Sequence, residues 1–247
     1  MQERIAELID VVGAANVVAG DDLSDDYSHD EALNGRSQAP LAVVKPTDRD
    51  QVSRTLRFAA ERGIPVTARG AASGLSGGCI PCAGGIVVSF ERMKRIVEID
   101  TENHVAVVEA GVTLADLNGT LEPMGLLYPV FPGEDCATIG GNVATNAGGM
   151  RAVKYGVTRH HVLGLEAVLA TGEVVRSGGK FVKTSSGYDL TQMIIGSEGT
   201  LALVTEVIVK LDKNGDVRNQ GGIDFDLIQR TINYWYTYSL DLFGGEI

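Results

Sequence analysis

Three glycine-rich segments contain the residues whose types and spacing could hold a cofactor. The first reads Arg69-Gly70-Ala71-Ala72-Ser73-Gly74-Leu75-Ser76-Gly77-Gly78 and directly follows an expected strand over residues 64–68. Small residues on a loop that leaves a strand let several backbone N–H groups point inward together. Such a nest binds a phosphate without needing a cationic surface. The segment therefore predicts a phosphate-binding loop.

The second segment, residues 131–149, is suited to a large flat ligand. It reads FPGEDCATIGGNVATNAGG and carries no charged residue after Asp135. Its backbone amides and its Asn and Thr side chains would supply donors for the polar edge of such a ligand. The third segment, residues 195–201, reads IGSEGTL and by itself indicates only a turn that enters a strand.

Two common nucleotide motifs are absent from these segments. The first loop does not have the G-x-G-x-x-G spacing of dinucleotide-binding Rossmann folds. The pair Gly179-Lys180 is followed by Phe181 and lacks the glycine five residues before Gly179, so it is not a P-loop. A nicotinamide Rossmann site and a P-loop NTPase are therefore poor fits.

The remaining chemistry-bearing residues give weaker signals. Cys79 and Cys82 form a C-x-x-C without a second pair, so four tetrahedral zinc ligands are not available, and a redox dithiol stays open. His160 and His161 are adjacent at the entry to a strand, where successive side chains point to opposite faces, which favours structural or surface roles. The acidic stretch 21–31 lacks the spacing of an EF-hand and is expected to be a solvated loop.

The first part of the chain is expected to begin with a β-α-β unit. A helix over residues 2–12 has Ile5, Leu8, Ile9 and Val12 on one face. A strand over 41–44 is followed by a helix that starts from Thr47 as its N-cap and ends at Arg62, with Gly63 as its stop. The strand over 64–68 completes the unit, with a parallel pairing to the first strand.

The rest of the chain is expected to be mainly antiparallel. Further elements are predicted as strands over 86–90, 95–100 and 104–110, a helix over 113–124 closed by Gly125, strands over 161–170 and 173–177 joined in a hairpin at Thr171-Gly172, a short helix over 189–195 and a strand over 200–211. The predicted fold class is α+β, with two lobes and a cleft between them.

Composition narrows the class of protein. Of the 247 residues, 21 are Lys or Arg and 32 are Asp or Glu, which gives a formal net charge of −11. This argues against a sequence-independent nucleic-acid binder, which needs a basic footprint. There is no apolar run that could form a transmembrane segment, and residues 1–10 lack the apolar core of a secretory signal. Three cysteines do not make a disulfide framework, so the cytoplasm is the expected location.

The three segments together resemble a known family. With Arg151, Tyr155-Gly156 and residues 186–190 (SGYDL) between them, they resemble the FAD-linked oxidases of the p-cresol methylhydroxylase and vanillyl-alcohol oxidase type, and within these the glycolate oxidase flavoprotein subunit and the D-lactate dehydrogenases. The resemblance implies a two-lobed FAD-binding domain over residues 5–211, with FAD in the cleft. Lobe one would cover about 5–110 and lobe two about 111–211, followed by an atypical helical tail over 212–247. The aromatic-rich stretch 225–242 of that tail reads either as a helix that docks on the FAD domain or as part of a fused reading frame.

The resemblance also implies a cofactor site. The loop around the pyrophosphate would comprise Arg69, Gly70, Ala71, Ala72, Ser73, Gly74, Leu75 and Gly77. The flavin would lie along Pro132, Gly133, Cys136, Gly141, Asn142, Ala144 and Thr145, and the nucleotide end near Glu198 and Gly199. Some relatives tether FAD through a histidine in the first glycine loop, and residues 70–78 contain none, so non-covalent FAD is implied. No metal site is expected, and no catalytic residue is identified.

The implied activity is a flavoprotein oxidoreductase, a dehydrogenase or oxidase of small 2-hydroxy acids such as glycolate or D-lactate. Electrons would pass from FAD to an iron–sulfur subunit, a second flavoprotein subunit or a quinone, and such a partner could place the protein at the membrane periphery. In these relatives a substrate-binding cap domain follows the region that matches. The alternative is therefore a flavin-binding module without its own substrate site, active only with another domain or chain. A murein-precursor reductase is a third, less favoured interpretation.

Overall fold

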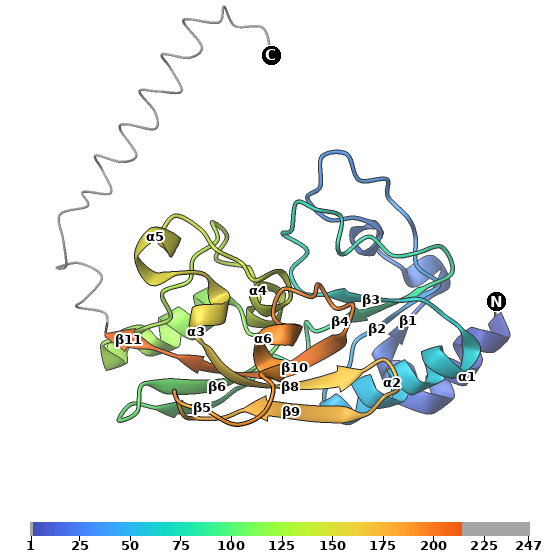
Figure 1. The fold of residues 1–247 in the computed structure, drawn as a ribbon. Coiled ribbons are helices and arrows are strands. Elements are labelled where there is room, and N and C mark those ends of the chain that lie inside the picture. Colours follow the sequence, from blue (N-terminus) through green and yellow to red (C-terminus); the bar gives the residue numbers. More distant parts are fainter. Residues whose placement is uncertain (1, 214–247) are drawn as a thin grey trace, which may run out of the picture. The chain divides into compact units, whose positions relative to one another are not determined.

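A four-stranded sheet forms from the first part of the chain (Figure 1). The computed structural model describes residues 2–213. The predicted tail over 212–247 therefore lies outside the described residues from 214 onward. The strands are β1 (Val17–Val18), β2 (Ala42–Val44), β3 (Val66–Arg69) and β4 (Ile86–Ser89), in the order β1-β2-β4-β3. β2 and β3 are both parallel to β4, and β1 is antiparallel to β2. The predicted parallel direction is confirmed, but the predicted direct pairing of β2 with β3 is wrong because β4 lies between them.

Two helices pack with this sheet. α1 (Gln2–Val12) and α2 (Arg49–Arg62) contribute Leu8, Val12, Val52 and Leu56 to a core shared with β2 and β4. The expected N-cap at Thr47 is wrong by one residue. The Asp48 carboxylate accepts the Gln51 N–H at 2.8 Å, while the Thr47 N–H donates to Gln51 Oε1. Both residue types suit this position, and the adjacent aspartate occupies it.

A five-stranded antiparallel sheet forms from the middle and the end of the described chain. Its strands are β5 (Ile96–Asp100), β6 (Val105–Glu109), β8 (Val162–Leu169), β9 (Val174–Gly178) and β10 (Ala202–Lys210), in the order β5-β6-β10-β8-β9. The predicted hairpin between β8 and β9 is confirmed, with Gly172 at φ 82° in its turn. β5 and β6 pair in this sheet, although the sequence placed them in lobe one. The extents of the lobes as domains remain a proposal.

Short helices cover one face of the second sheet. They are α3 (Leu114–Leu121), continued by η4 (Glu122–Met124), then α4 (Ile139–Thr145), α5 (Ala152–Tyr155) and α6 (Leu190–Ile194). The shorter elements are η1 (Ala14–Asn16), η2 (Gly20–Asp22), η3 (Asp25–Ser28), η5 (Thr158–His160) and the strand pair β7 (Leu126–Leu127) and β11 (Asp212–Lys213). Buried Leu114, Leu117 and Tyr128 form a core with β6, β8 and β10. Gly125, at φ 68°, ends η4 as the sequence predicts. In residues 2–213 no helix is long and apolar enough to cross a membrane.

α2 contacts both sheets. It lies on the four-stranded sheet and also packs against β8, and the Ser53 hydroxyl donates to the Gly172 carbonyl at 2.5 Å. The mixed helix and strand fold is therefore built from a parallel β-α-β part and an antiparallel part.

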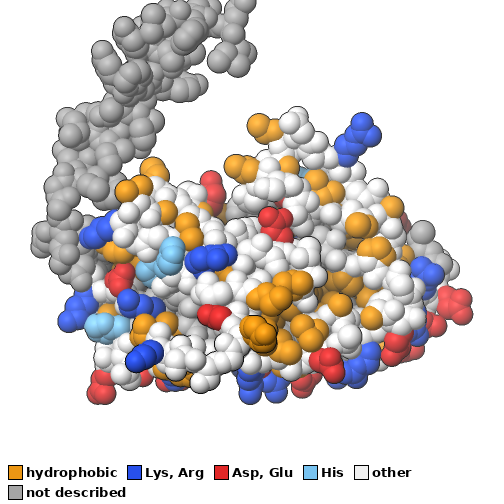
Figure 2. Space-filling model, in the orientation of Figure 1, with side chains coloured by type: hydrophobic (Ala, Val, Ile, Leu, Met, Phe, Trp, Pro, Cys, Tyr) orange, Lys and Arg blue, Asp and Glu red, His pale blue; other side chains and the backbone are white. Residues whose placement is uncertain are grey.

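Acidic and basic side chains are interspersed over the face shown in Figure 2, and no extended basic patch gathers there.

Candidate functional site

A cavity of about 390 Å³ lies where the three glycine-rich segments meet. Its walls come from the loop after β3, from α4 with the residues that flank it, and from residues 197–199 with the start of β10. Cavities of this size are typical of cofactor and ligand sites. Segments that are far apart in the sequence thus line a single pocket.

Most of the sequence-predicted residues line this cavity. They are Arg69, Gly70, Ala71, Ala72, Ser73, Gly74, Leu75, Pro132, Gly141, Asn142, Ala144, Thr145, Glu198 and Gly199. Gly77, Gly133 and Cys136 are not in its lining, and Cys136 carries an exposed free thiol.

The loop after β3 offers a run of unpaired backbone donors. Within the described chain, the amides of residues 71–78 donate no hydrogen bond to a protein group, whereas the Cys79 N–H donates to Asp30 Oδ2 at 3.2 Å. Ala72 has φ 57°, a left-handed conformation that is uncommon outside glycine and is found preferentially at functional sites. Unpaired amides that border a cavity are suited to an anionic ligand such as a phosphate.

The start of α4 does not offer such donors. The Ile139 and Gly140 amides donate to the carbonyls of Val112 and Ala110, and the Gly141 amide donates to Thr138 Oγ1. The N-terminal end of this helix is therefore satisfied by the protein itself. An anionic group in the cavity would be held at the loop rather than at the helix.

The Asp30 carboxylate supports the loop after β3. Its carboxylate accepts the Ala32 and Cys79 amides, and the Glu31 amide donates to the Gly74 carbonyl at 3.1 Å. Asp30 is only 8% exposed and lines the cavity, so the expectation of a solvated loop over 21–31 is wrong for this residue. Nothing in the sequence separates Asp30 from the other acidic residues of that stretch.

The opposite wall contains buried polar atoms without partners. Asn142 Nδ2 and Ser197 Oγ both belong to cavity-lining residues, and neither has a hydrogen-bond partner in the described chain. Buried donors are nearly always paired in native proteins, so these two atoms are suited to bind a ligand or an ordered water. Sequence reasoning missed Ser197 and also Thr138, which caps α4. The N-cap pattern before Ile139 could have indicated Thr138.

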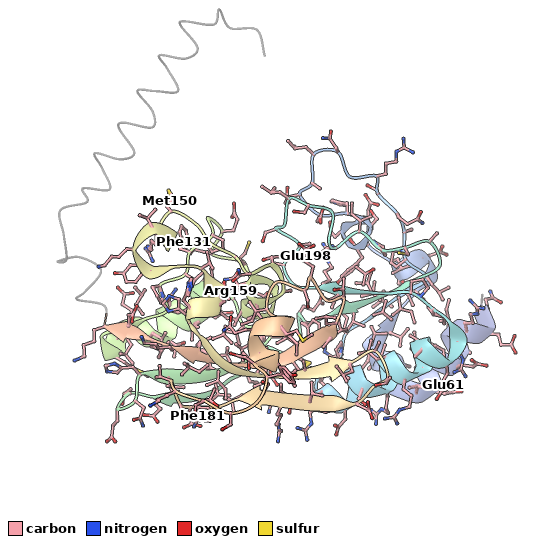
Figure 3. The ribbon with its side chains drawn as sticks, viewed as in Figure 1. Glu61, Phe131, Met150, Arg159, Phe181 and Glu198 are labelled. Carbon is pink, nitrogen blue, oxygen red and sulfur yellow. The ribbon has the colours of Figure 1, made fainter. Side chains whose placement is uncertain are left out.

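The loop before β10 is fastened to α4. The Gly196 amide donates to the Val143 carbonyl and the Glu198 amide to the Ala144 carbonyl, at 2.9 and 2.8 Å. Glu198 adopts φ 52° and Gly199 φ 77°, and Glu198 lies toward the loop after β3 (Figure 3). This arrangement brings residues on the third segment against the other two.

The charged groups of the lining are few. Arg69, Asp30 and Glu198 line the cavity, and Arg69 Nη1 donates to the His29 carbonyl at 2.7 Å, with its guanidinium over the Tyr27 ring. Burial raises the pKa of the Cys79 thiol, which also borders the cavity. The donors that the cavity offers to an anionic ligand are therefore mainly backbone N–H groups.

The weaker candidates lie elsewhere. His161 is buried, its Nε2 is 2.9 Å from the Tyr155 carbonyl, and burial lowers its pKa. His160 is exposed, and its Nδ1 accepts the Val157 amide. Neither lines the cavity. Among residues 2–213, no group of three or more His, Cys, Asp or Glu side chains is placed to hold a metal ion.

Comparison with known proteins identifies the family. Residues 40–178 match the model of the FAD binding domain family, and this match covers more than half of the chain. The chain belongs to this family. The matched region includes the loop after β3 and also α4. FAD is the cofactor that the family binds.

Three relatives match this FAD-binding chain over most of its length. It is 53% identical over 236 residues to an uncharacterised FAD-linked oxidoreductase of Mycobacterium tuberculosis, covering 94% of this chain and 51% of the relative. It is 48% identical over 191 residues to a D-lactate dehydrogenase of Archaeoglobus fulgidus, covering 76% and 43%. It is 47% identical over 186 residues to glycolate oxidase subunit GlcD of Bacillus subtilis, covering 75% and 39%. The chain therefore spans about half the length of these relatives or less.

A solved structure supports the fold. The p-cresol methylhydroxylase structure superposes with a TM-score of 0.75 at 22% identity, covering 86% of this chain and 43% of that one. The predicted FAD-binding fold of the p-cresol methylhydroxylase type is confirmed.

Proposed function

We propose that the cavity described above holds FAD, with its pyrophosphate on the amides of residues 71–76 and 78. The observation that carries this proposal is the run of unpaired amides at one wall, opposite the unpaired Asn142 and Ser197 atoms. Gly74 has open space where a Cβ would be, and Thr138 Oγ1 is the one atom near such a position on Gly141. A cofactor can approach the backbone closely at both glycines.

We further propose that this FAD-linked oxidoreductase acts on small 2-hydroxy acids such as glycolate or D-lactate. The relatives named D-lactate dehydrogenase and GlcD support this substrate class. FAD, when bound, supplies the acceptor for the hydride of the substrate's carbinol carbon. The described residues bind and orient the cofactor. We also propose that electrons pass from FAD to a partner subunit. The proposed location is the cytoplasm, where such a partner could hold the protein at the membrane periphery.

A second candidate is a flavin-binding module that obtains its substrate site from another domain or chain. The described lining favours it, because it contains no histidine and its one cation, Arg69, is held by the His29 carbonyl. A 2-hydroxy acid needs a cation for its carboxylate and a base near its hydroxyl.

A chimera separates these candidates. Residues 1–211 joined to the remaining part of the Archaeoglobus D-lactate dehydrogenase would be loaded with FAD and mixed anaerobically with D-lactate, L-lactate and glycolate. If these acids bleach the flavin absorbance of the chimera but not that of the chain alone, the result supports a module that takes part in 2-hydroxy-acid oxidation. A chimera that binds FAD but is reduced by none of these acids contradicts the proposed substrate class. Absence of bound flavin from both proteins contradicts the FAD site.

A further inference from the structure

Three glutamates face one another across three neighbouring strands of the second sheet. In β10, Glu206 is in register with Glu109 of β6 on one side and with Glu166 of β8 on the other. Neighbouring strands are roughly 4.8 Å apart, and like charges directly opposite each other are destabilising. The described lining of the cavity includes none of the three carboxylates of this row.

The two outer members of the row have arginine partners. Glu109 is 4% exposed and is bound by Arg95, the residue before β5, whose Nη2 and Nε lie 2.7 and 3.0 Å from Glu109 Oε1. Glu166 is 6% exposed, and its Oε2 accepts from Arg49 of α2 at 2.6 Å and from Arg176 of β9 at 2.8 Å. The contacts with Arg49 and Arg176 lower the pKa of Glu166 against the effect of its burial.

Glu206 has no such partner. The described residues give its side chain neither a hydrogen bond nor an ion pair, although it is half-buried between the other two carboxylates. Burial raises its pKa, and the charges of Glu166 and Glu109 raise it further, against the opposing charges of Arg176 and Arg49. Asp48, the N-cap of α2, adds a negative charge close to Arg95. As pH falls, the middle carboxylate therefore takes up a proton before Glu166 does.

The row also connects the two sheets. Arg49 is the first residue of α2, which packs on the four-stranded sheet, and its ion pair with Glu166 joins that helix to β8. An ionised Glu206 competes with Glu166 for Arg49 and Arg176, whereas a protonated Glu206 is a potential hydrogen-bond donor to either neighbour. We propose that Glu206 is a proton-binding site, and that its protonation strengthens the packing of α2 against the five-stranded sheet.

The sign of the pH dependence follows from proton linkage. A carboxyl whose pKa is higher in the folded state than in the unfolded state binds its proton more tightly when folded. The free energy of unfolding therefore falls as pH rises from the unfolded pKa of about 4.3 through the raised folded value. Glu166, whose folded pKa is lowered, acts in the opposite direction and only toward lower pH. Glu206→Gln should remove the first effect and leave the second.

Carbon-13 NMR of glutamate carboxyl groups tests the proton site, with Glu206→Gln used for assignment. The Glu206 carboxyl should titrate above an ordinary glutamate, and the value should shift downward in Glu109→Gln and in Glu166→Gln. A Glu206 carboxyl that titrates at or below the ordinary value overturns the proposal. So does a raised value that neither neighbouring substitution changes.

Hydrogen exchange tests the coupling to α2. After correction for intrinsic rates, the α2 amides of the wild-type protein should be more protected at a pH below the Glu206 titration midpoint measured by NMR than at a pH above it. Glu206→Gln should abolish this difference. Glu102→Gln makes the same chemical change at an exposed turn and should leave the difference intact. Equal protection at both pH values, or a difference that survives in Glu206→Gln, overturns the coupling.

Discussion

The backbone at Gly70 and the hydroxyl of Thr138 approach so closely that a Cβ on Gly70 would overlap Thr138 Oγ1. Gly70 begins the loop after β3, and Thr138 caps α4 by accepting the Gly141 amide at 3.1 Å. The contact therefore sets the spacing between the loop and the helix, the two walls of the proposed FAD site.

We expect Gly70→Ala to lower both stability and FAD affinity. Overpacking of this kind costs about 1–3 kcal/mol, because either the loop or the cap must move. Thr138→Ala alone removes the cap and should cost about 1 kcal/mol. In the double variant the overlapping oxygen is absent, so the combined loss should be smaller than the sum of the single losses. Unfolding by urea measures these changes, and strictly additive losses would contradict the close contact. Gly119→Ala, in α3 with open space around it, is the control and should not destabilise the protein.

The sequence pointed to the segments that line this cavity better than to the residues that support them. Glycine-rich composition located the loop after β3 and α4, because backbone that approaches a ligand needs small residues whatever the rest of the fold. Asp30 could not be found in this way, since its role depends on a fold that brings the residues after η3 against the loop. Likewise, local pattern showed that β2 and β3 are parallel but could not show that β4, which comes later in the chain, inserts between them.

Bulky side chains at Gly74 or Gly141 should remove flavin binding while the fold is kept. Neither glycine has a positive φ, so the effect arises from occupied space and not from backbone strain. In Gly74→Leu and Gly141→Leu the Kd for FAD should rise at least tenfold, which corresponds to about 1.4 kcal/mol. Fluorescence titration with FAD measures this, and circular dichroism checks the fold. Wild-type affinity in Gly141→Leu would show that the cofactor does not lie against α4.

Bound FAD should be released when the protein is precipitated with acid. No histidine lines the cavity in the described chain, and the one thiol there, Cys79, has its pKa raised by burial. A covalent link to either residue type is therefore not expected. The flavin absorbance should appear in the supernatant after centrifugation, and absorbance that stays with the pellet would contradict a non-covalent cofactor.

Cys79 and Cys82 should hold no metal. Metal binding needs thiolates, and burial favours the protonated form of Cys79. Two cysteines alone would also leave a tetrahedral site half filled. Elemental analysis of the purified protein should give far less than one zinc or iron per chain. One equivalent that disappears in the Cys79→Ser/Cys82→Ser variant would refute this expectation.

The chain alone, with FAD bound, should oxidise glycolate and lactate at a negligible rate. Hydride transfer requires the substrate carbon within about 3–3.5 Å of the flavin and a base in hydrogen-bond reach of the hydroxyl. In the described lining the ionisable groups are Asp30, Arg69, Cys79 and Glu198, and Asp30 and Arg69 are engaged by protein groups. Anaerobic mixing with millimolar D-lactate, L-lactate or glycolate should leave the oxidised spectrum unchanged for minutes, while dithionite should reduce the flavin readily. Rapid bleaching by any of these acids would mean that the FAD-binding domain carries a complete substrate site, with Glu198 the first residue to test as its base.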